Sequence, residues 1–189
     1  MTVEEQAKDV GEAVKALVGQ ASSIGVDPNR IVLMGHSAGA HLAALVATDP
    51  QYAGEAFGAI RGVILLDGAG YDIATSMDAE RLIGRRLYNS AFGTDPERHA
   101  SLSPLTHVGG EDAPNWLALY VEQRRISRVQ SHSLADALKA QGKSASAVAI
   151  SDTNHGRMNR EMGLSAGAAQ TEAVDSFLEE VFTGQNGED

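Results

Sequence analysis

The sequence predicts an α/β domain in which a mostly parallel sheet is flanked by helices, and two observations support this prediction. Short, wholly apolar runs alternate along the chain with longer segments whose apolar residues recur every three or four positions. A short apolar run fits a strand that is buried on both faces, as in a parallel sheet. Strands alternating with helices imply parallel βαβ units with right-handed crossovers. We expect the 189 residues to form a single domain.

The first βαβ unit is predicted from periodicity and turn residues. Residues 2–23 carry apolar side chains on one helical face, and Gly25 with the following Asp-Pro-Asn ends that helix. Residues 31–34 form an apolar run that predicts a strand. Residues 38–48 are small and helix-forming.

The rest of the chain repeats this alternation around one irregular segment. Strands are expected at 63–66, 116–121 and 146–150, and helices at 128–141 and 168–183. Residues 75–110 read as a cap-like insertion with a helix near 79–87 and proline-bearing loops at 95–96 and 103–104. The tail, 184–189, is expected to fray.

Composition excludes several classes of function. The chain has no cysteine, so disulfides, thiolate catalysis and cysteine-ligated zinc are excluded, and no metal or organic cofactor is expected. A net charge of −10 gives no basic surface for nucleic acid or anionic lipid. No apolar run is long enough for a membrane span, and the acidic N-terminus does not resemble a signal peptide. These features predict a cytoplasmic protein.

Residues 35–39 (Gly-His-Ser-Ala-Gly) match the pattern G-x-S-x-G, with Ser37 at its centre. The pattern directly follows a predicted buried strand and opens a predicted helix, which is the placement that a nucleophile elbow requires. Glycines around the serine would let strand and helix backbones approach closely. The helix N-terminus favours negative charge. The sequence therefore predicts Ser37 as a nucleophile and the Ala38 N–H as an oxyanion donor.

A nucleophilic serine needs a histidine base, and the chain has six histidines. We expect His155 to be the base because it lies in the loop after the last predicted strand, at the carboxyl edge of the sheet. His36 and His41 are too near Ser37 in sequence to face it, so we expect them to line the substrate pocket or support the elbow. The other three, expected in ordinary surface or substrate contacts, are His99, His107 and His132.

The acid that orients the base is the least determined member. Glu122, the first carboxylate after the strand at 116–121, is our choice. Asp67, which follows the strand at 63–66, is the second candidate. Asp152 is a third, although it is very close to His155 in sequence. Either type of carboxylate can accept the imidazole N–H.

These motifs resemble α/β-hydrolase esterases of the hormone-sensitive-lipase and arylformamidase-like group. The similarity is carried by residues 35–41, by 27–31 before them, by 92–105, and by the histidine loop 154–160, and it extends from about residue 5 to 180. It implies a three-layer α/β-hydrolase sandwich, a Ser-His-acid triad and hydrolysis of small acyl esters through an acyl-enzyme. An arylformamidase-type amide hydrolase would have the same fold and triad, so it remains an alternative.

Two departures from this group have consequences. Its members usually carry a His-Gly-Gly loop before the elbow that completes the oxyanion hole, and this sequence starts at the helix before the elbow strand. The usual cost of losing one oxyanion donor is about a hundred- to a thousandfold in turnover, so weak activity is expected. Also, 122–124 (Glu-Gln-Arg) stand where an Asp is usual. A second alternative is therefore a non-catalytic C-terminal hydrolase half that serves as an assembly or binding module.

The resemblance also predicts an uncovered sheet edge. The strand at 31–34 would pair in that group with a strand that this sequence lacks, and a bare apolar edge favours pairing with another chain. We therefore expect a homo-oligomer. The other expected partner is a small ester substrate, with neither nucleic acid nor membrane.

Overall fold

A four-stranded parallel sheet forms the centre of the protein. The computed structural model describes residues 1–79 and 82–183. The strand order is β1-β2-β3-β4, and each strand runs parallel to its neighbour. The strands are β1 (Ile31–His36), β2 (Ile60–Leu66), β3 (Asn115–Val121) and β4 (Ser144–Ile150). The predicted α/β class with a parallel sheet is confirmed.

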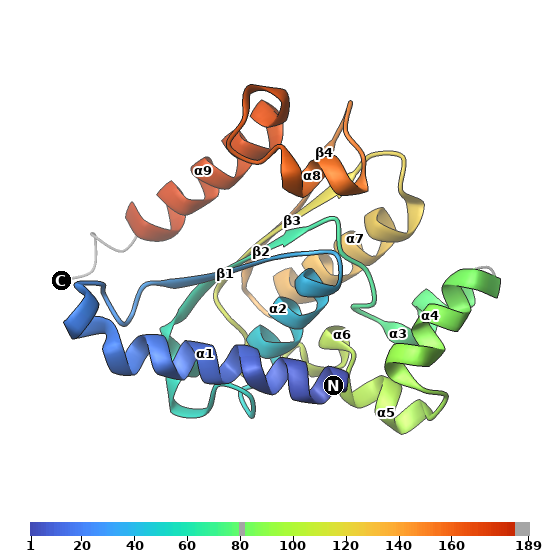
Figure 1. Ribbon diagram of the computed structural model, residues 1–189, viewed down its shortest axis with the longest axis horizontal. Coiled ribbons are helices and arrows are strands. Elements are labelled where there is room, and N and C mark those ends of the chain that lie inside the picture. The colour runs from blue at the N-terminus through green and yellow to red at the C-terminus, as the bar shows by residue number, and fades with distance from the viewer. Residues whose placement is uncertain (80–81, 184–189) are drawn as a thin grey trace.

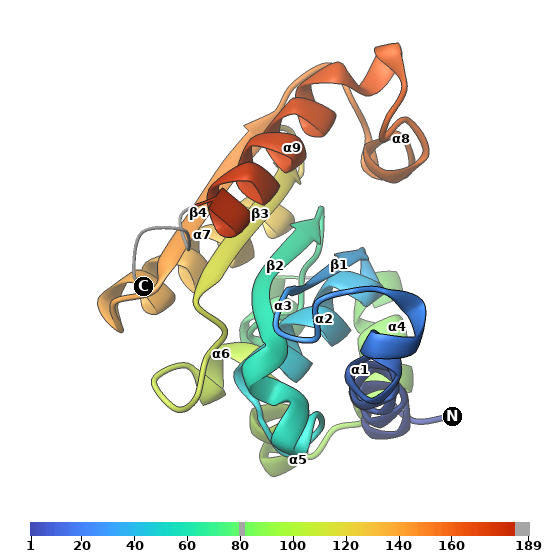
Figure 2. The same cartoon turned by 90° about the vertical axis from the view of Figure 1, so that its left-hand side faces the viewer.

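Helices cover both faces of this sheet, so the fold has three layers with the sheet in the middle (Figures 1 and 2). On one face lie α1 (Val3–Ile24), α2 (Ala38–Thr48) and α7 (Arg125–Ala140). On the other lie α8 (His155–Arg160) and α9 (Ala168–Thr183). Successive strand residues point to opposite faces, so each strand supplies both cores. The two clusters divide β2 in this way: Val63 and Leu65 belong to one cluster, and Ile64 and Leu66 to the other.

The segment between β2 and β3 is helical where the sequence suggested loops. It contains α3 (Ile73–Ala79), α4 (Leu82–Phe92), α5 (Pro96–Ser101) and α6 (Pro104–His107). The prediction of proline-bearing loops at 95–96 and 103–104 was wrong. Each proline occupies the first turn of a short helix, where its missing N–H costs nothing. Two positions of the helix expected at 79–87, residues 80 and 81, and the tail 184–189 lie outside the described residues.

The remaining elements are short. A 3-10 helix η1 (Gly54–Ala59) precedes β2, and η2 (Ser165–Gly167) precedes α9. The strand expected at 63–66 starts earlier, at Ile60, because it also pairs with the first residue of β1. Within the described ranges, none of the helices combines the length and apolarity that crossing a membrane requires.

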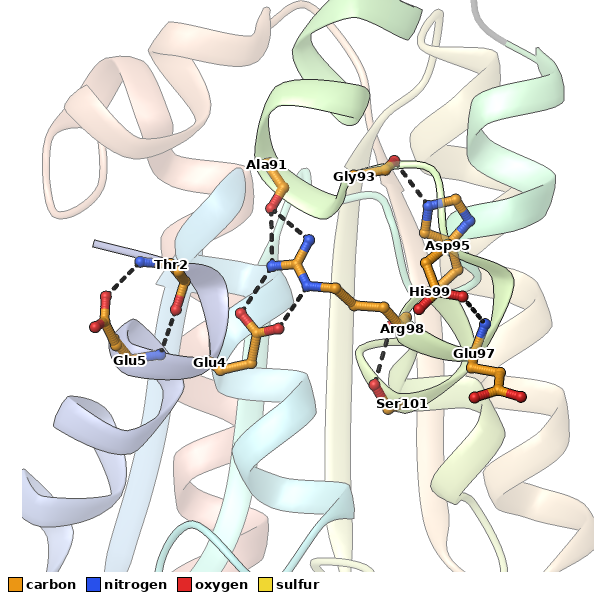
Figure 3. Close-up of polar contacts among 10 residues, drawn as sticks. All are labelled: Thr2, Glu4, Glu5, Ala91, Gly93, Asp95, Glu97, Arg98, His99 and Ser101. Atoms are coloured by element: carbon orange, nitrogen blue, oxygen red, sulfur yellow. Dashed lines mark hydrogen bonds and ion pairs between the residues drawn. The ribbon is translucent and has the colours of Figure 1, made fainter.

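An ion pair ties the start of α1 to the α4–α5 segment (Figure 3). Arg98 donates from Nε and Nη2 to the two carboxylate oxygens of Glu4, at 2.6 and 2.8 Å, and also to the carbonyl of Ala91 at 3.3 Å. The hydrogen bonds and charge of Arg98 lower the pKa of Glu4 to about 2. The contact matters for the site because the first turns of α1 line the pocket described below.

Candidate active site

Ser37 occupies a sharp turn between β1 and α2. Its backbone has φ 57° and ψ −118°, an unusual conformation for a residue with a side chain, and its N–H donates to the carbonyl of Leu66 at 3.0 Å. A Cβ on Gly35 would lie 2.1 Å from the carbonyl oxygen of Gly39, so Gly35 is required. A Cβ on Gly39 would meet nothing within 4 Å. The elbow therefore needs one of the two glycines for close approach, whereas the sequence suggested both.

His155 lies within hydrogen-bond distance of Ser37. It opens α8, whose N-cap Asn154 accepts a hydrogen bond from the N–H of Arg157. The Nε2 atom of His155 lies 2.9 Å from Oγ of Ser37, and its Nδ1 lies 2.7 Å from Oδ2 of Asp67. Side chains that follow β1, β2 and β4 thus meet at the carboxyl ends of the strands, where parallel sheets place ligands.

The carboxylate of Asp67 is fully buried and held by several donors. Its Oδ1 accepts from the N–H of Val121 at 3.0 Å, and its Oδ2 accepts from Nη1 of Arg124 as well as contacting His155. Burial by itself raises the pKa of this carboxyl, but the hydrogen bonds from Val121, Arg124 and His155 outweigh it, and the pKa lies below its ordinary value. Asp67 is therefore ionised and able to hold a histidine.

The structure does not bring Glu122 or Asp152 to His155. The backbone N–H of Glu122 extends the sheet by donating to Ile150, and its exposed carboxylate accepts from the amide of Gln123 at 3.2 Å. Asp152 is also exposed. The geometry thus favours Asp67, the second candidate, over Glu122. The reason is strand order: β2 is the direct neighbour of β1, so the residue that ends β2 lies beside the elbow.

His36 supports His155 and is not among the pocket-lining residues. Its Nε2 donates to the backbone carbonyl of His155 at 2.7 Å, and the two ring centroids are 4.5 Å apart. Burial is the main cause that lowers the pKa of His36. Of the two roles that the sequence suggested for His36, the structure therefore favours support of the site over contact with substrate.

His41 lines the pocket from the first turns of α2. Its Nδ1 donates to the carbonyl of Gly70 at 3.0 Å, and its ring packs edge-on against Phe92. Burial lowers the pKa of His41 to about 4, so the ring is neutral at pH 7. The three remaining histidines bond locally, His99 to Gly93, His107 to Ser101, and His132 to Tyr120.

A pocket of about 530 Å³ opens beside Ser37. Apolar side chains from α2, α4 and α7 form most of its wall, and Ser37 and Ala38 lie in it together with Asp67 and Arg124. Arg124 carries no motif that would mark it as a site residue, although it immediately precedes α7 and follows the strand end where chemistry was expected. Among the described residues, no group of three metal-ligating side chains is found. The apolar wall is formed by Val3, Leu42, Leu87, Phe92 and Ile126.

One curated protein is similar in sequence to nearly all of this chain. The protein named "Probable carboxylic ester hydrolase LipM" of Mycobacterium tuberculosis (strain ATCC 25618 / H37Rv) is 29% identical over 192 aligned residues, which cover 94% of this chain and 43% of that protein. The chain therefore spans less than half the length of this curated relative.

Solved structures of an esterase have a similar fold. The apo form of Thermogutta terrifontis esterase 2 is similar at a TM-score of 0.73 and 26% identity, covering 96% of this chain and 67% of that one. The same esterase phosphonylated by sarin gives a TM-score of 0.76 at 24% identity, covering 96% and 68%. A family model described as alpha/beta hydrolase fold matches residues 2–159. This match confirms the resemblance seen in the elbow and the histidine loop, and the chain belongs to the alpha/beta hydrolase fold family.

Proposed function

We propose that this chain hydrolyses esters of small carboxylic acids, with Ser37 as nucleophile, His155 as general base and Asp67 as the acid that orients it. One observation carries the proposal. A continuous series of contacts runs from Oγ of Ser37 to Nε2 of His155 at 2.9 Å, and from Nδ1 of His155 to Oδ2 of Asp67 at 2.7 Å. This is the arrangement by which a weak nucleophile is activated for acyl transfer.

The steps follow from these contacts. Oγ of Ser37 attacks the ester carbonyl while Nε2 of His155 takes the hydroxyl proton, and Asp67 stabilises the imidazolium through Nδ1. The carbonyl oxygen becomes an oxyanion, for which the N–H of Ala38 at the start of α2 is a donor. The tetrahedral intermediate collapses, His155 gives its proton to the leaving alcohol, and an acyl-enzyme forms. Water activated by His155 then releases the acid and restores Ser37.

The names of the relatives support ester hydrolysis. The solved neighbours are structures of an esterase, and the curated relative is named for carboxylic ester hydrolysis. The esterase is also described as phosphonylated by sarin and phosphorylated by paraoxon. Apolar side chains along the pocket suit a short acyl chain.

The test is hydrolysis of p-nitrophenyl butyrate by the wild type and by Ser37→Ala, together with labelling by a fluorophosphonate probe. We expect turnover and labelling in the wild type and neither in Ser37→Ala. Peptide mapping should place the label on Ser37. Equal rates in the two proteins, with no label on Ser37, would refute the proposal and favour a non-catalytic module.

We also propose that the protein forms a homo-oligomer through β1, as a second copy can cover that edge. In the described sheet β1 is an edge strand, and Met34 on it is 54% exposed. Met34→Lys should shift the protein toward monomer in sedimentation velocity. A wild type that sediments as a monomer at micromolar concentration would exclude this assembly. The cytoplasmic location and the single-domain organisation remain predictions.

A further inference from the structure

The guanidinium of Arg124 contacts the proposed acid and base and also lies on the pocket. Its Nη1 donates to the carboxylate of Asp67 and to the backbone carbonyl of Asp67 at 3.1 Å, and it lies 2.6 Å from Nδ1 of His155. The side chain is 33% exposed and lines the pocket that holds Ser37. The positively charged guanidinium is therefore placed where it can contact both a bound substrate and the proposed base.

Nδ1 of His155 has two close neighbours of opposite kind. Asp67 is an acceptor at 2.7 Å, and Nη1 of Arg124 is a donor at 2.6 Å. When Nδ1 carries the proton and donates to Asp67, Nε2 has a free lone pair for the proton of Ser37. When Nδ1 accepts from Arg124, the proton of the neutral ring must be on Nε2, and His155 cannot act as a base. Moving Arg124 away from Nδ1 favours the active tautomer.

If Arg124 moves away from Nδ1, it has N–H groups with which it can bind another acceptor. A guanidinium carries five N–H groups, and within the part of the chain that the structure describes, only those of Arg124 Nη1 have acceptors. The N–H groups on Nε and Nη2 form the edge that matches a carboxylate in a two-point contact. Apart from Asp67, which is fully buried, Arg124 is the one charged residue among the described residues that line this pocket.

We propose that Arg124 makes this site selective for half-esters of short dicarboxylic acids, whose acyl chain ends in a second, ionised carboxylate. That carboxylate accepts hydrogen bonds from Nε and Nη2 of Arg124 and draws the guanidinium away from Nδ1 of His155. Nδ1 of His155 then donates its proton to Asp67 without competition from Arg124. The acyl chain is short because a single imidazole ring separates the contact with Arg124 from the contact with Ser37. This inference rests on the proposed ester hydrolysis and adds the substrate class to it.

The overall charge of the chain makes this recognition a local effect. A net charge of −10 repels an anionic substrate at long range. At about 0.15 M salt this repulsion is screened beyond roughly 8 Å, whereas a direct contact between guanidinium and carboxylate is screened much less. Assays should therefore be run at that ionic strength.

The test compares monoethyl glutarate with ethyl pentanoate, a neutral ester of the same acyl length, by pH-stat titration. We expect the wild type to favour monoethyl glutarate in kcat/KM by about tenfold or more, the usual value of a hydrogen bond to a charged group. Arg124→Met should bring the ratio to one or below, and Arg124→Lys should restore part of it. A general loss of activity cancels in this ratio. A wild-type ratio near one, or an equal ratio in Arg124→Met, would overturn the inference.

Arg125→Met is the matched control. Arg125 is the next residue, is exposed and is not among the residues that line the pocket, so its loss changes the net charge equally. The ratio of Arg125→Met should equal that of the wild type. A drop as large as in Arg124→Met would mean that net charge, and not contact, sets the preference, which also overturns the inference.

A binding measurement distinguishes the proposed anion recognition by Arg124 from the proposed ester hydrolysis. In a Ser37→Ala background, calorimetry with monoethyl glutarate should show binding that weakens at least about tenfold when Arg124→Met is added, and not when Arg125→Met is added. If no ester is turned over but this binding pattern holds, hydrolysis fails and anion recognition stands. If esters are hydrolysed with no preference and no such binding, the reverse is true.

Discussion

The Nε2 atom of His36 lies 2.7 Å from the backbone carbonyl oxygen of His155, so the residue before the proposed nucleophile holds the proposed base. The two rings also pack at 4.5 Å. His36→Phe keeps a ring and removes the hydrogen bond, which is worth about 1 kcal/mol. We expect kcat for p-nitrophenyl butyrate to fall about fivefold with KM nearly unchanged.

His36→Gln provides the comparison, because its amide can donate to the same carbonyl. It should recover part of the lost kcat. If His36→Phe raises KM and leaves kcat intact, His36 contacts the substrate, as the sequence analysis also allowed.

Asp67 and Glu122 are matched candidates whose environments differ. Asp67→Asn removes the charge that stabilises the imidazolium and disturbs the tautomer of His155, so kcat should drop by about three to four orders of magnitude. Glu122→Gln changes an exposed side chain and should leave kcat within about twofold. Initial rates with p-nitrophenyl butyrate measure both. The opposite ranking would assign the acid to Glu122.

The two glycines of the elbow should respond differently to the same change. Gly35→Ala forces a Cβ to within 2.1 Å of the backbone oxygen of Gly39, so we expect a loss of at least about 3 kcal/mol in unfolding free energy. Gly39→Ala puts a methyl group into open space at the start of α2 and should be neutral or stabilising by up to about 1 kcal/mol. Urea unfolding distinguishes them, and equal effects would contradict this elbow geometry.

His41 should make stability depend on pH. Its pKa is about 4 in the folded state, against an ordinary value of 6.5, because the ring is buried. Between these values the unfolded state binds more protons, so the unfolding free energy falls as pH drops through 6.5 toward 4. His41→Gln lacks this titration. From pH 7.5 to 4.5 the wild type should lose about 2 kcal/mol more than His41→Gln in urea unfolding. Parallel losses would show that His41 can be protonated in the folded state.

The ion pair between Glu4 and Arg98 should contribute modestly to the unfolding free energy, and this contribution should depend on pH. The side chain of Glu4 is 42% exposed, so solvent screening limits the coupling to about 0.5–1 kcal/mol. Because the pKa of Glu4 is lowered from 4.5 to about 2, this contribution is complete above pH 4.5 and is lost as the pH falls through 2. A double-mutant cycle with Glu4→Gln and Arg98→Gln measures it at pH 7 and at pH 2.5. A coupling that stays constant down to pH 2 or rises on acidification would contradict the assignment.

The order of strands and helices and the placement of Ser37 were determined by local sequence. Apolar runs mark the four strands, and glycine and serine at 35–39 fit a strand-to-helix turn, so both can be seen without tertiary contacts. The same holds for the position of His155 at a strand end. The short helices α5 and α6 were missed because proline signals both a loop and the first turn of a helix.

Only the tertiary structure decided which carboxylate and which cation join Ser37 and His155. Asp67 and Glu122 both end buried strands, so their local patterns are equivalent. What separates them is that β2 lies next to β1, which buries Asp67 beside the elbow and leaves Glu122 in solvent. Arg124 contacts a residue 57 positions away, and the contact exists only because parallel pairing aligns the carboxyl ends of β2 and β3. Strand order and register are set by packing across the whole sheet, and no local segment encodes them.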